Sequence, residues 1–597
     1  MNGSGHMVAK IPSRSPNNTR SNCKRPTIVT LPPSRLHAAY FVARDALLAE
    51  RTADGFWVGE LSTSALSTAV AAIALQLVDD AKYSSQIAGG IRWLSQHQNA
   101  DGGWGDTTKS LSNISTSMLC RAALAVTKME NTYPDTVARI EAYLARTCGQ
   151  TPAERAEAIR DRYGKDRTFS VPILMTCAIA GLVPWREVPR LPFELACLPQ
   201  SWYRFAQLPV VSYALPALIA IGQCVHHHRG TWNPLAKLLR WLAKSPSLRV
   251  LRRIQPSSGG YLEATPLTAF VAMALANIGQ SDSPVTREAI RFIVDSVRPD
   301  GSWPIDTNLS IWVTTLSVNA LSAANDLDAI EDREPLQAWL LEQQLKVRHP
   351  FTGADPGGWG WSHCPGSVPD CDDTPGAILA LQNLGMKSTD ETLQNGRRWM
   401  NDLRNRDGGQ PTFCRGWGTL PFDRSGSDLT AHALRADPAN REAGLAYLAR
   451  QQRPDGSWLP LWFGNQHAPD DINPVYGTAR VLAAYRDLQL MHTTQCQRGV
   501  SYLLSVQNAD GGWGGASDCP SSVEETAVAV EVLLDLAADD IRVQLGIAWL
   551  IDAVESGRFR EPSPIGFYFA KLWYFEKLYP LIFIVAALGR ARTRITS

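Results

Sequence analysis

A recurring peptide that ends in tryptophan constrains the fold of this chain more than any other feature. Gln98-Asn-Ala-Asp-Gly-Gly-Trp104 returns as Gln507-Asn-Ala-Asp-Gly-Gly-Trp513, and Gln452-Arg-Pro-Asp-Gly-Ser-Trp458 is a close copy. Weaker copies end at Trp57, Tyr261, Trp303 and Trp359, and Gly408-Gly409-Gln410 is a decayed one. From Tyr261 onward, neighbouring copies lie 42, 56, 51, 48 and 55 residues apart. Periods of this size indicate stacked supersecondary units.

Each interval between copies has room for two helices. After Tyr261, apolar residues recur at helical spacing over 265–278, and a second helical pattern follows over 286–297. The Asp-Gly-Gly tripeptide is typical of a turn that ends a helix. We expect the Gln side chain to bond backbone groups at the next helix end and the Trp ring to cover the junction. The pattern predicts an all-α protein, as closed α/α barrels or an open solenoid, and leaves open a non-catalytic scaffold.

Length, charge and cysteine content narrow the class of protein. At 597 residues the chain is too long for one ordinary core, so two or more domains are expected. A net charge of +1 gives no reason to expect a nucleic-acid partner, and 11 scattered cysteines without a CxxC pair indicate reduced thiols and no zinc site. No apolar run is long enough to predict a spanning helix. Residues 1–32 are expected to lack order, and their first seven resemble a tag remnant.

The acidic cluster Asp370-Cys371-Asp372-Asp373-Thr374 is the sharpest chemical motif. The following residues predict a helix with Thr374 as N-cap and Pro375 at its first position, so the carboxylates precede a helix N-terminus. Three acids within four residues repel one another, so one holds a proton readily, while the helix dipole and a nearby cation would keep that acid strong. Protonation of an alkene needs such a proton. A calcium loop is excluded because the spacing lacks the required Gly and Glu.

A second motif, Ser427-Asp428-Leu-Thr-Ala-His432, is predicted to open another helix with Ser427 as N-cap. Asp428 and His432 are four residues apart and share a helix face. A carboxylate bonded to one imidazole nitrogen favours the imidazolium ion, whose other N–H could bond Asp372 and stabilise its conjugate base. A purely structural histidine is the alternative.

These motifs together resemble the squalene–hopene and oxidosqualene cyclases, which carry Q-x-x-x-G-x-W repeats, a D-x-D-D-T motif and a D-x-T-A-H motif. The resemblance spans about residues 33–595. It implies two α/α barrels (α6–α6 toroids), the first inserted after the opening helix of the second. Residues 33–52 and 308–597 would then form the catalytic barrel, and 53–307 the other.

The resemblance also assigns roles to individual residues. Asp372 would be the proton donor, within a cluster that includes Asp370 and Asp373, and His432 with Asp428 would support it. Positions that match the family's aromatic cavity lining are Trp312, Trp361, Phe413, Trp462, Tyr476 and Tyr213. Such rings stabilise carbocations in a dry pocket, although ordinary core packing is the alternative for each one. The aromatic stretch 567–575 belongs to the same region, but its register is open.

We therefore expect a cofactor-free and metal-independent enzyme in which a proton starts the cyclisation of a linear polyprenoid. Squalene, converted to a hopene-like polycyclic triterpene, is the first hypothesis. A class II cyclase acting on another polyprenoid or on a prenyl diphosphate is the second. The product, ring count and stereochemistry, and the way the cation is quenched, stay open.

Residues 234–254 interleave leucines and Trp241 with several lysines and arginines, and Pro246 is predicted to break them into two short helices. Leu and Trp beside basic residues are typical of a helix that lies in a membrane interface. We expect a monotopic protein at the cytoplasmic face of a membrane, from which it takes a squalene-like substrate; a homodimer is compatible with the same resemblance. An amphipathic barrel helix with its Leu face in the core is the alternative.

Overall fold

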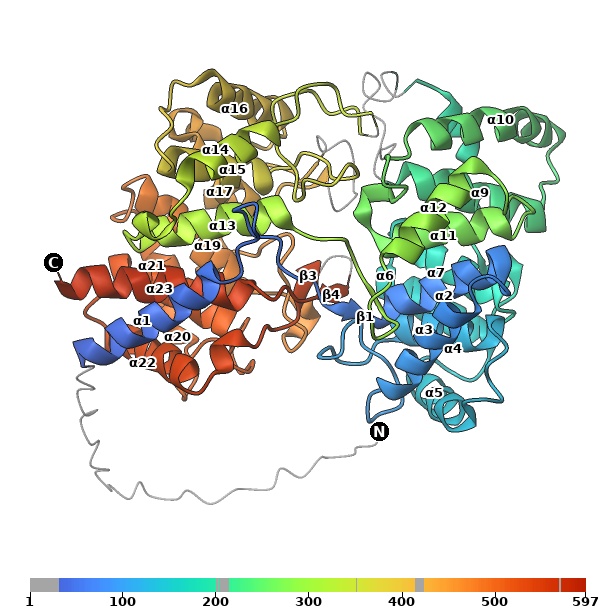
Figure 1. The fold of residues 1–597 in the computed structure, drawn as a ribbon, viewed down its shortest axis with the longest axis horizontal. Helices are drawn as coiled ribbons and strands as arrows, with labels where there is room; N and C mark the ends of the chain where they lie inside the picture. The colour runs from blue at the N-terminus through green and yellow to red at the C-terminus, as the bar shows by residue number, and fades with distance from the viewer. Residues whose placement is uncertain are drawn as a thin grey trace, which may run out of the picture. The chain divides into compact units, whose positions relative to one another are not determined.

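The regular secondary structure of the computed structural model is almost entirely helical (Figure 1), with two short antiparallel strand pairs among its described residues. It describes residues 32–199, 202, 214–350, 352–413, 423–567 and 571–596. The prediction of disorder for residues 1–32 falls almost wholly outside this part of the chain. The all-α class and the α/α-barrel architecture expected from the repeats are confirmed.

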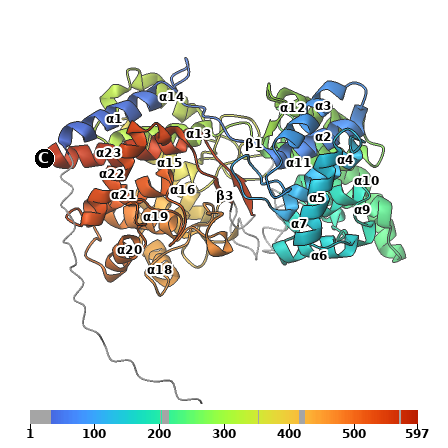
Figure 2. The same ribbon diagram turned by 90° about the horizontal axis from the view of Figure 1, so that it is seen from below.

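The C-terminal barrel has a closed inner ring of six helices, in which each helix contacts the next and the last returns to the first. The inner helices are α13 (Ser310–Ala323), α15 (Asp373–Asn383), α17 (Ser427–Ala436), α19 (Pro474–Asp487), α21 (Val523–Leu536) and α23 (Tyr579–Thr596). The outer helices are α14 (Arg333–Glu342), α16 (Glu391–Leu403), α18 (Glu442–Gln451), α20 (Thr494–Ser505), α22 (Ile541–Glu555) and α1 (Pro33–Leu48). Figure 2 shows α1 beside α23, so the two ends of the described chain share one barrel.

The N-terminal barrel is built in the same way. Among the described residues its inner ring has five helices: α2 (Ala65–Asp79), α4 (Ile114–Val126), α7 (Arg167–Ile179), α9 (Leu215–Arg229) and α11 (Thr265–Ala276). The helices that pack around it are α3 (Ser84–Gln96), α5 (Pro134–Thr147), α6 (Pro152–Tyr163), α10 (Pro234–Arg253) and α12 (Pro284–Asp295). The inner helices are buried nearly all round, because they contact the ring on both sides and an outer helix behind.

The repeat tryptophans join each outer helix to the next inner helix. In Trp458 the indole Nε1–H donates to the Leu448 carbonyl at 2.7 Å, and the backbone N–H donates to Thr478 Oγ1 at 3.0 Å. The same pair of bonds occurs at the other repeats that end in tryptophan, at Trp57, Trp104, Trp303, Trp359 and Trp513, with Ser117 in place of threonine at Trp104. These six rings are at most 1% exposed. Helix ends leave polar groups unpaired unless water or a side chain bonds them. Each tryptophan supplies such a partner at a buried helix end, where water is excluded.

The repeat glutamine bonds the backbone as expected. Gln452 Nε2 donates to the Gly456 carbonyl and to the Gln495 carbonyl in the first turn of α20, both at 2.9 Å. Gln507 and Gln98 do the same in their repeats. Gly456 has a φ of 95°, which non-glycine residues rarely adopt, so this turn requires glycine.

Two of the repeats explain how one barrel is inserted into the other. Trp57 follows α1, yet its backbone N–H bonds Thr314 of α13. Trp303 follows α12, and its backbone N–H bonds Thr68 of α2. The strand β1 (Thr63–Ser64) pairs with β2 (Trp303–Pro304) beside this crossing. Each ring is thus closed by a junction between segments more than two hundred residues apart.

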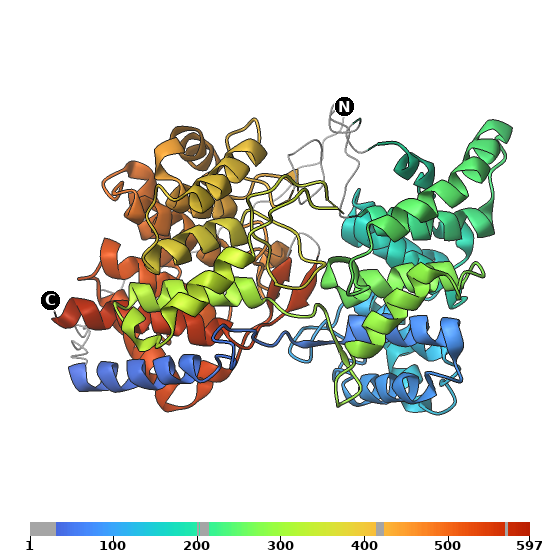
Figure 3. The same cartoon turned by 45° about the horizontal axis from the view of Figure 1, so that its top comes forward.

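Helix α10 lies at the outer edge of its barrel (Figure 3). It continues through Pro246 as one helix, so the predicted break is wrong. Its inward face is narrow, with Ala243, Ser247 and Leu251 buried. Leu248 and Val250 pack partly buried against the barrel core, whereas the apolar side chains of the first half point outward: Leu235, Leu238, Leu239, Trp241 and Leu242 are 52–68% exposed. The alternative that the whole Leu face belongs to the core therefore fails.

Candidate active site

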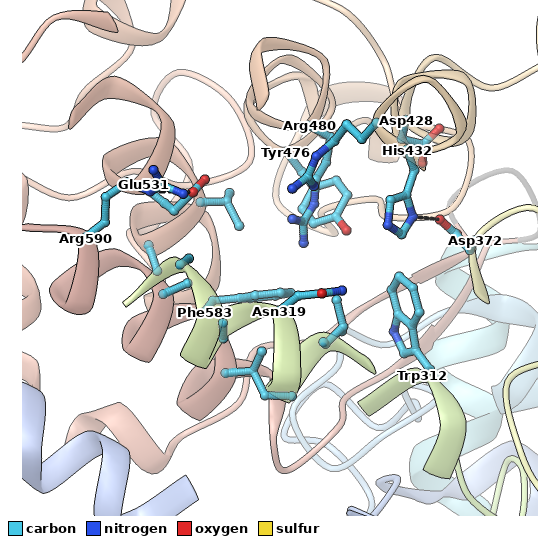
Figure 4. Close-up of a pocket in the computed structure, with 18 residues that line it drawn as sticks. Trp312, Asn319, Asp372, Asp428, His432, Tyr476, Arg480, Glu531, Phe583 and Arg590 are labelled. Atoms are coloured by element: carbon cyan, nitrogen blue, oxygen red, sulfur yellow. Dashed lines mark ion pairs between the residues drawn. The ribbon is translucent and has the colours of Figure 1, made fainter. Parts of the chain in front are cut away.

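Two cavities meet at the acidic motif. The larger has a volume of about 280 Å³ and an almost entirely apolar wall that includes Asp370, Asp372 and Asp373. The smaller, of about 100 Å³, is drawn in Figure 4 and is lined by charged, polar and apolar groups from α13, α17, α19, α21 and α23. Asp372 and Trp312 line both cavities. The carboxyl of Asp372 therefore stands between an apolar chamber and a smaller one that contains several charged groups.

The start of α15 presents this carboxyl. Asp370 Oδ1 accepts hydrogen bonds from the backbone N–H groups of Asp372 and Asp373, both at 2.8 Å. The helix begins at Asp373, one residue after Asp372, so the prediction of Thr374 as N-cap is wrong. The Thr374 hydroxyl instead bonds the backbone of Trp359 as part of the repeat. Because Asp370 satisfies the helix start, the side chain of Asp372 is left for chemistry.

The acidic cluster holds protons because it is buried. Burial raises the pKa of Asp372 above its ordinary value, while the charge of Arg480 opposes that rise. Burial, followed by repulsion from Asp370, raises the pKa of Asp373 as well. The pKa of Asp370 is raised chiefly by burial. Repulsion among the acids was the expected cause, and the structure makes it secondary to desolvation.

His432 lies beside the acid, with its Nδ1 atom 3.6 Å from Asp372 Oδ1. Burial, together with the charges of Arg435 and Arg480, lowers the pKa of His432 well below its ordinary value. The imidazole is therefore neutral at physiological pH, and the expectation of an imidazolium ion is wrong. The proximity of His432 to Asp372, which the two motifs predicted, is present.

Asp428 makes a different contact from the one expected. Its Oδ1 accepts a hydrogen bond from the backbone N–H of Leu461 at 2.9 Å, and not from His432. Burial, followed by the charge of Asp372, raises its pKa to about 7. The helix α17 also starts at Ser427 itself, with Gly426 as N-cap, so the predicted cap shifts by one residue. Asp428 joins α17 to the loop after Trp458 and does not charge the imidazole.

A buried arginine completes the surroundings of the acid, and the motifs did not predict it. Arg480 lies one turn after Tyr476 on α19, and its guanidinium carbon is 4.8 Å from the centre of the Tyr476 ring. It lines the smaller cavity together with Asp372 and His432. An arginine four residues after a predicted cavity tyrosine was the available signal, because such residues share a helix face.

Four of the predicted aromatic residues line the larger cavity: Trp312, Trp361, Phe413 and Trp462. Three of them form a run of ring contacts, with centroids 6.0 Å apart for Trp361 and Phe413 and 5.9 Å for Phe413 and Trp462. The Trp312 indole donates to the Tyr579 hydroxyl at 3.0 Å and closes the wall near the acid. These rings can face a cation along the length of a chain held in the cavity.

The other two predicted aromatic residues are placed differently. Tyr476 is 2% exposed and lines the smaller cavity, behind the acid, and not the larger one. Tyr213 lies outside the described residues.

The register of the C-terminal aromatic stretch follows from a hairpin. Strand β3 (Ile565–Phe567) pairs with β4 (Leu572–Tyr574), so alternate side chains face opposite sides. Phe567, Leu572 and Tyr574 line the larger cavity, and the Phe567 ring centre is 4.3 Å from that of Trp462. Trp573 points the other way, and its backbone N–H bonds Asp106 Oδ2 at 2.8 Å. Phe567 and Tyr574 are therefore cavity residues that the sequence left unassigned.

The arrangement combines a carboxylic acid whose pKa burial raises to about 7 with an apolar chamber walled by aromatic faces. Such a chamber can receive an alkene, add the acid's proton to it and shield the resulting cations from water. Fold and site together define a class II terpene cyclase. The squalene–hopene cyclase N-terminal domain model matches residues 42–254 and the C-terminal domain model matches residues 309–593, so the chain belongs to the squalene–hopene cyclase family.

Individual relatives agree with this placement. The chain is 25% identical over 656 residues to a probable squalene–hopene cyclase of Sinorhizobium fredii, covering 92% of this chain and 96% of the relative. It is 26% identical over 633 residues to enfumafungin synthase of Hormonema carpetanum, covering 87% of this chain but only 45% of that longer protein. It is also 25% identical over 456 residues to drimenyl diphosphate synthase of Streptomyces showdoensis, covering 69% of this chain and 77% of the relative.

Among solved structures, ent-copalyl diphosphate synthase from Streptomyces platensis has the same fold. The TM-score is 0.57 at 17% sequence identity, and the match covers 94% of this chain and 99% of that one. Relatives named for squalene and for prenyl diphosphates thus both resemble this chain, so the family fixes the class of reaction and not the substrate.

Proposed function

We propose that this protein cyclises a neutral linear polyprenoid, with squalene as the first candidate, by proton transfer from Asp372. One observation carries the choice of a neutral substrate. Among the described residues that line the larger cavity, none is a lysine or an arginine. A diphosphate buried against these described residues would find no counter-charge among them, at a cost of roughly several kcal/mol per ion. A hydrocarbon requires none.

The sequence of events follows from the positions of the groups. The substrate fills the larger cavity with a terminal alkene at the Asp372 carboxyl. The O–H bond of Asp372 breaks, a C–H bond forms at the alkene, and the positive charge moves along the chain as rings close. The last cation either loses a proton to form an alkene or adds water and then releases a proton, and Asp372 takes up a proton before the next turnover. The aromatic wall faces each cationic centre, a contact worth about 0.5–2 kcal/mol per ring. No step requires a metal or a cofactor.

The test is incubation of the purified protein with squalene, 2,3-oxidosqualene and geranylgeranyl diphosphate, followed by mass spectrometry of the products. We expect cyclised products from squalene that form equally well in EDTA. Turnover of the diphosphate alone, or activity lost to EDTA and restored by Mg²⁺, would replace this proposal by the prenyl diphosphate alternative.

We further propose that the protein takes its substrate from a membrane surface through α10. Trp241 is 68% exposed and Leu242 55%, on a helix that also carries Lys237, Lys244 and Arg249. Exposed apolar groups of this kind insert into the acyl boundary, while each cation adds about 1 kcal/mol near an anionic surface. Among the described residues no helix could cross a bilayer. The described cysteines are unpaired thiols, which fits the cytoplasmic face.

A further inference from the structure

Arg480 is a largely buried cation that makes no ion pair of its own among the described residues, although the charges of Glu531 and Asp372 both raise its pKa. Its guanidinium carbon lies 4.8 Å from the Tyr476 ring centre and 5.1 Å from that of Phe583, so two aromatic faces enclose it. Its side chain hydrogen-bonds Tyr476, but among the described residues its Nη2 atom has no hydrogen-bond partner. Enclosing an unpaired charge is expensive, so such a group calls for a function.

The other arginines of the smaller cavity are already paired. Arg435 bonds Asp487 at 2.6 Å. Arg590 lies 2.9 Å from both Glu531 and Asp535. In Figure 4 the Arg480 side chain descends from α19 into the space between the Glu531–Arg590 pair and the Asp372–His432 pair. Arg480 is therefore the cation in this cavity that can respond to a new negative charge.

That new charge arises on Asp372. When its O–H bond breaks and the proton forms a C–H bond with the alkene, the electron pair stays on the carboxylate. His432 does not supply the compensating charge, because burial holds its pKa well below the ordinary value. Arg480 carries its charge at every working pH. The attraction between Arg480 and Asp372 favours the carboxylate form of the acid, since Arg480 lowers the pKa of Asp372 against the effect of burial.

We propose that Arg480 is a positioning residue that stabilises the carboxylate left on Asp372 after proton transfer, acting across the smaller cavity. This proposal deepens the proposed function and rests on it. A cavity of about 100 Å³ has room for water molecules between the two groups. The apolar chamber then stays dry while the charge is stabilised from behind the acid, where water does no harm.

Any pH effect must be assigned among the groups around Asp372. These are Asp370 and Asp373 at the start of α15, Asp428, His432 and Arg435 on α17, Tyr476 and Arg480 on α19, Glu531 on α21, Arg590 on α23 and Tyr574 on β4. Of these, only Arg480 is an enclosed cation without a bonded carboxylate.

The test measures the pKa of Asp372 directly and does not depend on turnover. The infrared band of its protonated carboxyl group is assigned as the band that Asp372→Asn removes, and is titrated in wild type, Arg480→Gln and Arg480→Lys. We expect the midpoint to move to higher pH in Arg480→Gln and to stay near wild type in Arg480→Lys. Squalene turnover should fall about tenfold for each pKa unit of that shift. The alkaline limb of its pH profile should move to higher pH together with the midpoint.

Arg590→Gln is the matched control, because it removes a paired cation from the same cavity. It should lower the melting temperature without moving the Asp372 midpoint. An unmoved midpoint in folded Arg480→Gln, or an equal shift in Arg480→Lys, would overturn the proposal. Failure of the proposed function has a different signature, namely wild-type protein that titrates as expected but leaves squalene unchanged.

Discussion

Nδ1 of His432 lies 3.6 Å from Oδ1 of Asp372, and the two residues come from helices that two separate motifs open. The contact is longer than a hydrogen bond, and the imidazole is neutral because it is buried. We expect the histidine to help position the acid without adding charge to it. This pair, with Arg480 behind it and the aromatic chamber in front, is the basis for the predictions that follow.

Asp372→Asn should abolish cyclisation while the fold stays intact, because an amide has no acidic proton to transfer. Squalene consumption and thermal unfolding are the measurements. Asp390→Asn is the matched control: it makes the same chemical change at the N-cap of α16, where Asn also caps well, and should keep full activity. Folded Asp372→Asn with more than a few per cent of wild-type turnover would place the acid elsewhere.

Activity should fall as pH rises through the raised pKa of Asp372, because only the protonated acid can initiate the reaction. His432→Ala should lower kcat strongly without abolishing it, since the imidazole positions the acid and does not deliver the proton. Because His432 is neutral, its removal should not delete a limb of the kcat-against-pH profile near pH 6.5, which is roughly the ordinary pKa of histidine. A kcat-against-pH series for both proteins checks this, and unchanged kinetics would remove His432 from the mechanism.

Trp361→Ala and Phe413→Ala should each yield prematurely quenched, partly cyclised products. Their rings are 6.0 Å apart on the wall of the larger cavity, and a cation that loses one such face loses about 0.5–2 kcal/mol. Gas chromatography of the products is the measurement. Trp399→Ala is the control, because Trp399 is buried on α16 outside the cavity wall and should reduce only stability. If all three variants lower stability with unchanged product ratios, the two rings are ordinary core.

Replacement of Leu238, Trp241 and Leu242 by Ser should abolish co-sedimentation with anionic liposomes and leave the melting temperature nearly unchanged. These side chains are 52–68% exposed, so their removal creates little cavity. As a control, Val42, Leu111 and Val347, which are 50–69% exposed at other places, can be replaced by Ser with lipid binding retained. A large fall in melting temperature with lipid binding intact would contradict an interfacial role for α10.

Local chemistry explains why much of this protein could be predicted. The Asp-Gly-Gly turn needs a left-handed glycine, and the Gln and Trp of the repeat bond backbone groups within a few turns of their own position. Such interactions depend on short stretches of chain, so helix pairs and barrels follow from the sequence pattern. The proximity of Asp372 and His432 was foreseeable for the same reason, once each motif was placed at the start of an inner helix.

Only the tertiary structure decided the electrostatics of the site and its division into a larger and a smaller cavity. Whether His432 is charged depends on how much water its neighbours exclude, and those neighbours come from several helices distant in sequence. Tyr476 faces the smaller cavity and Phe567 the larger because of ring closure and strand pairing, which no local pattern encodes. Arg480 acquires its importance only when α19 and α23 enclose it between two rings. Residue types and their spacing are local properties, whereas desolvation is a property of the whole packed barrel.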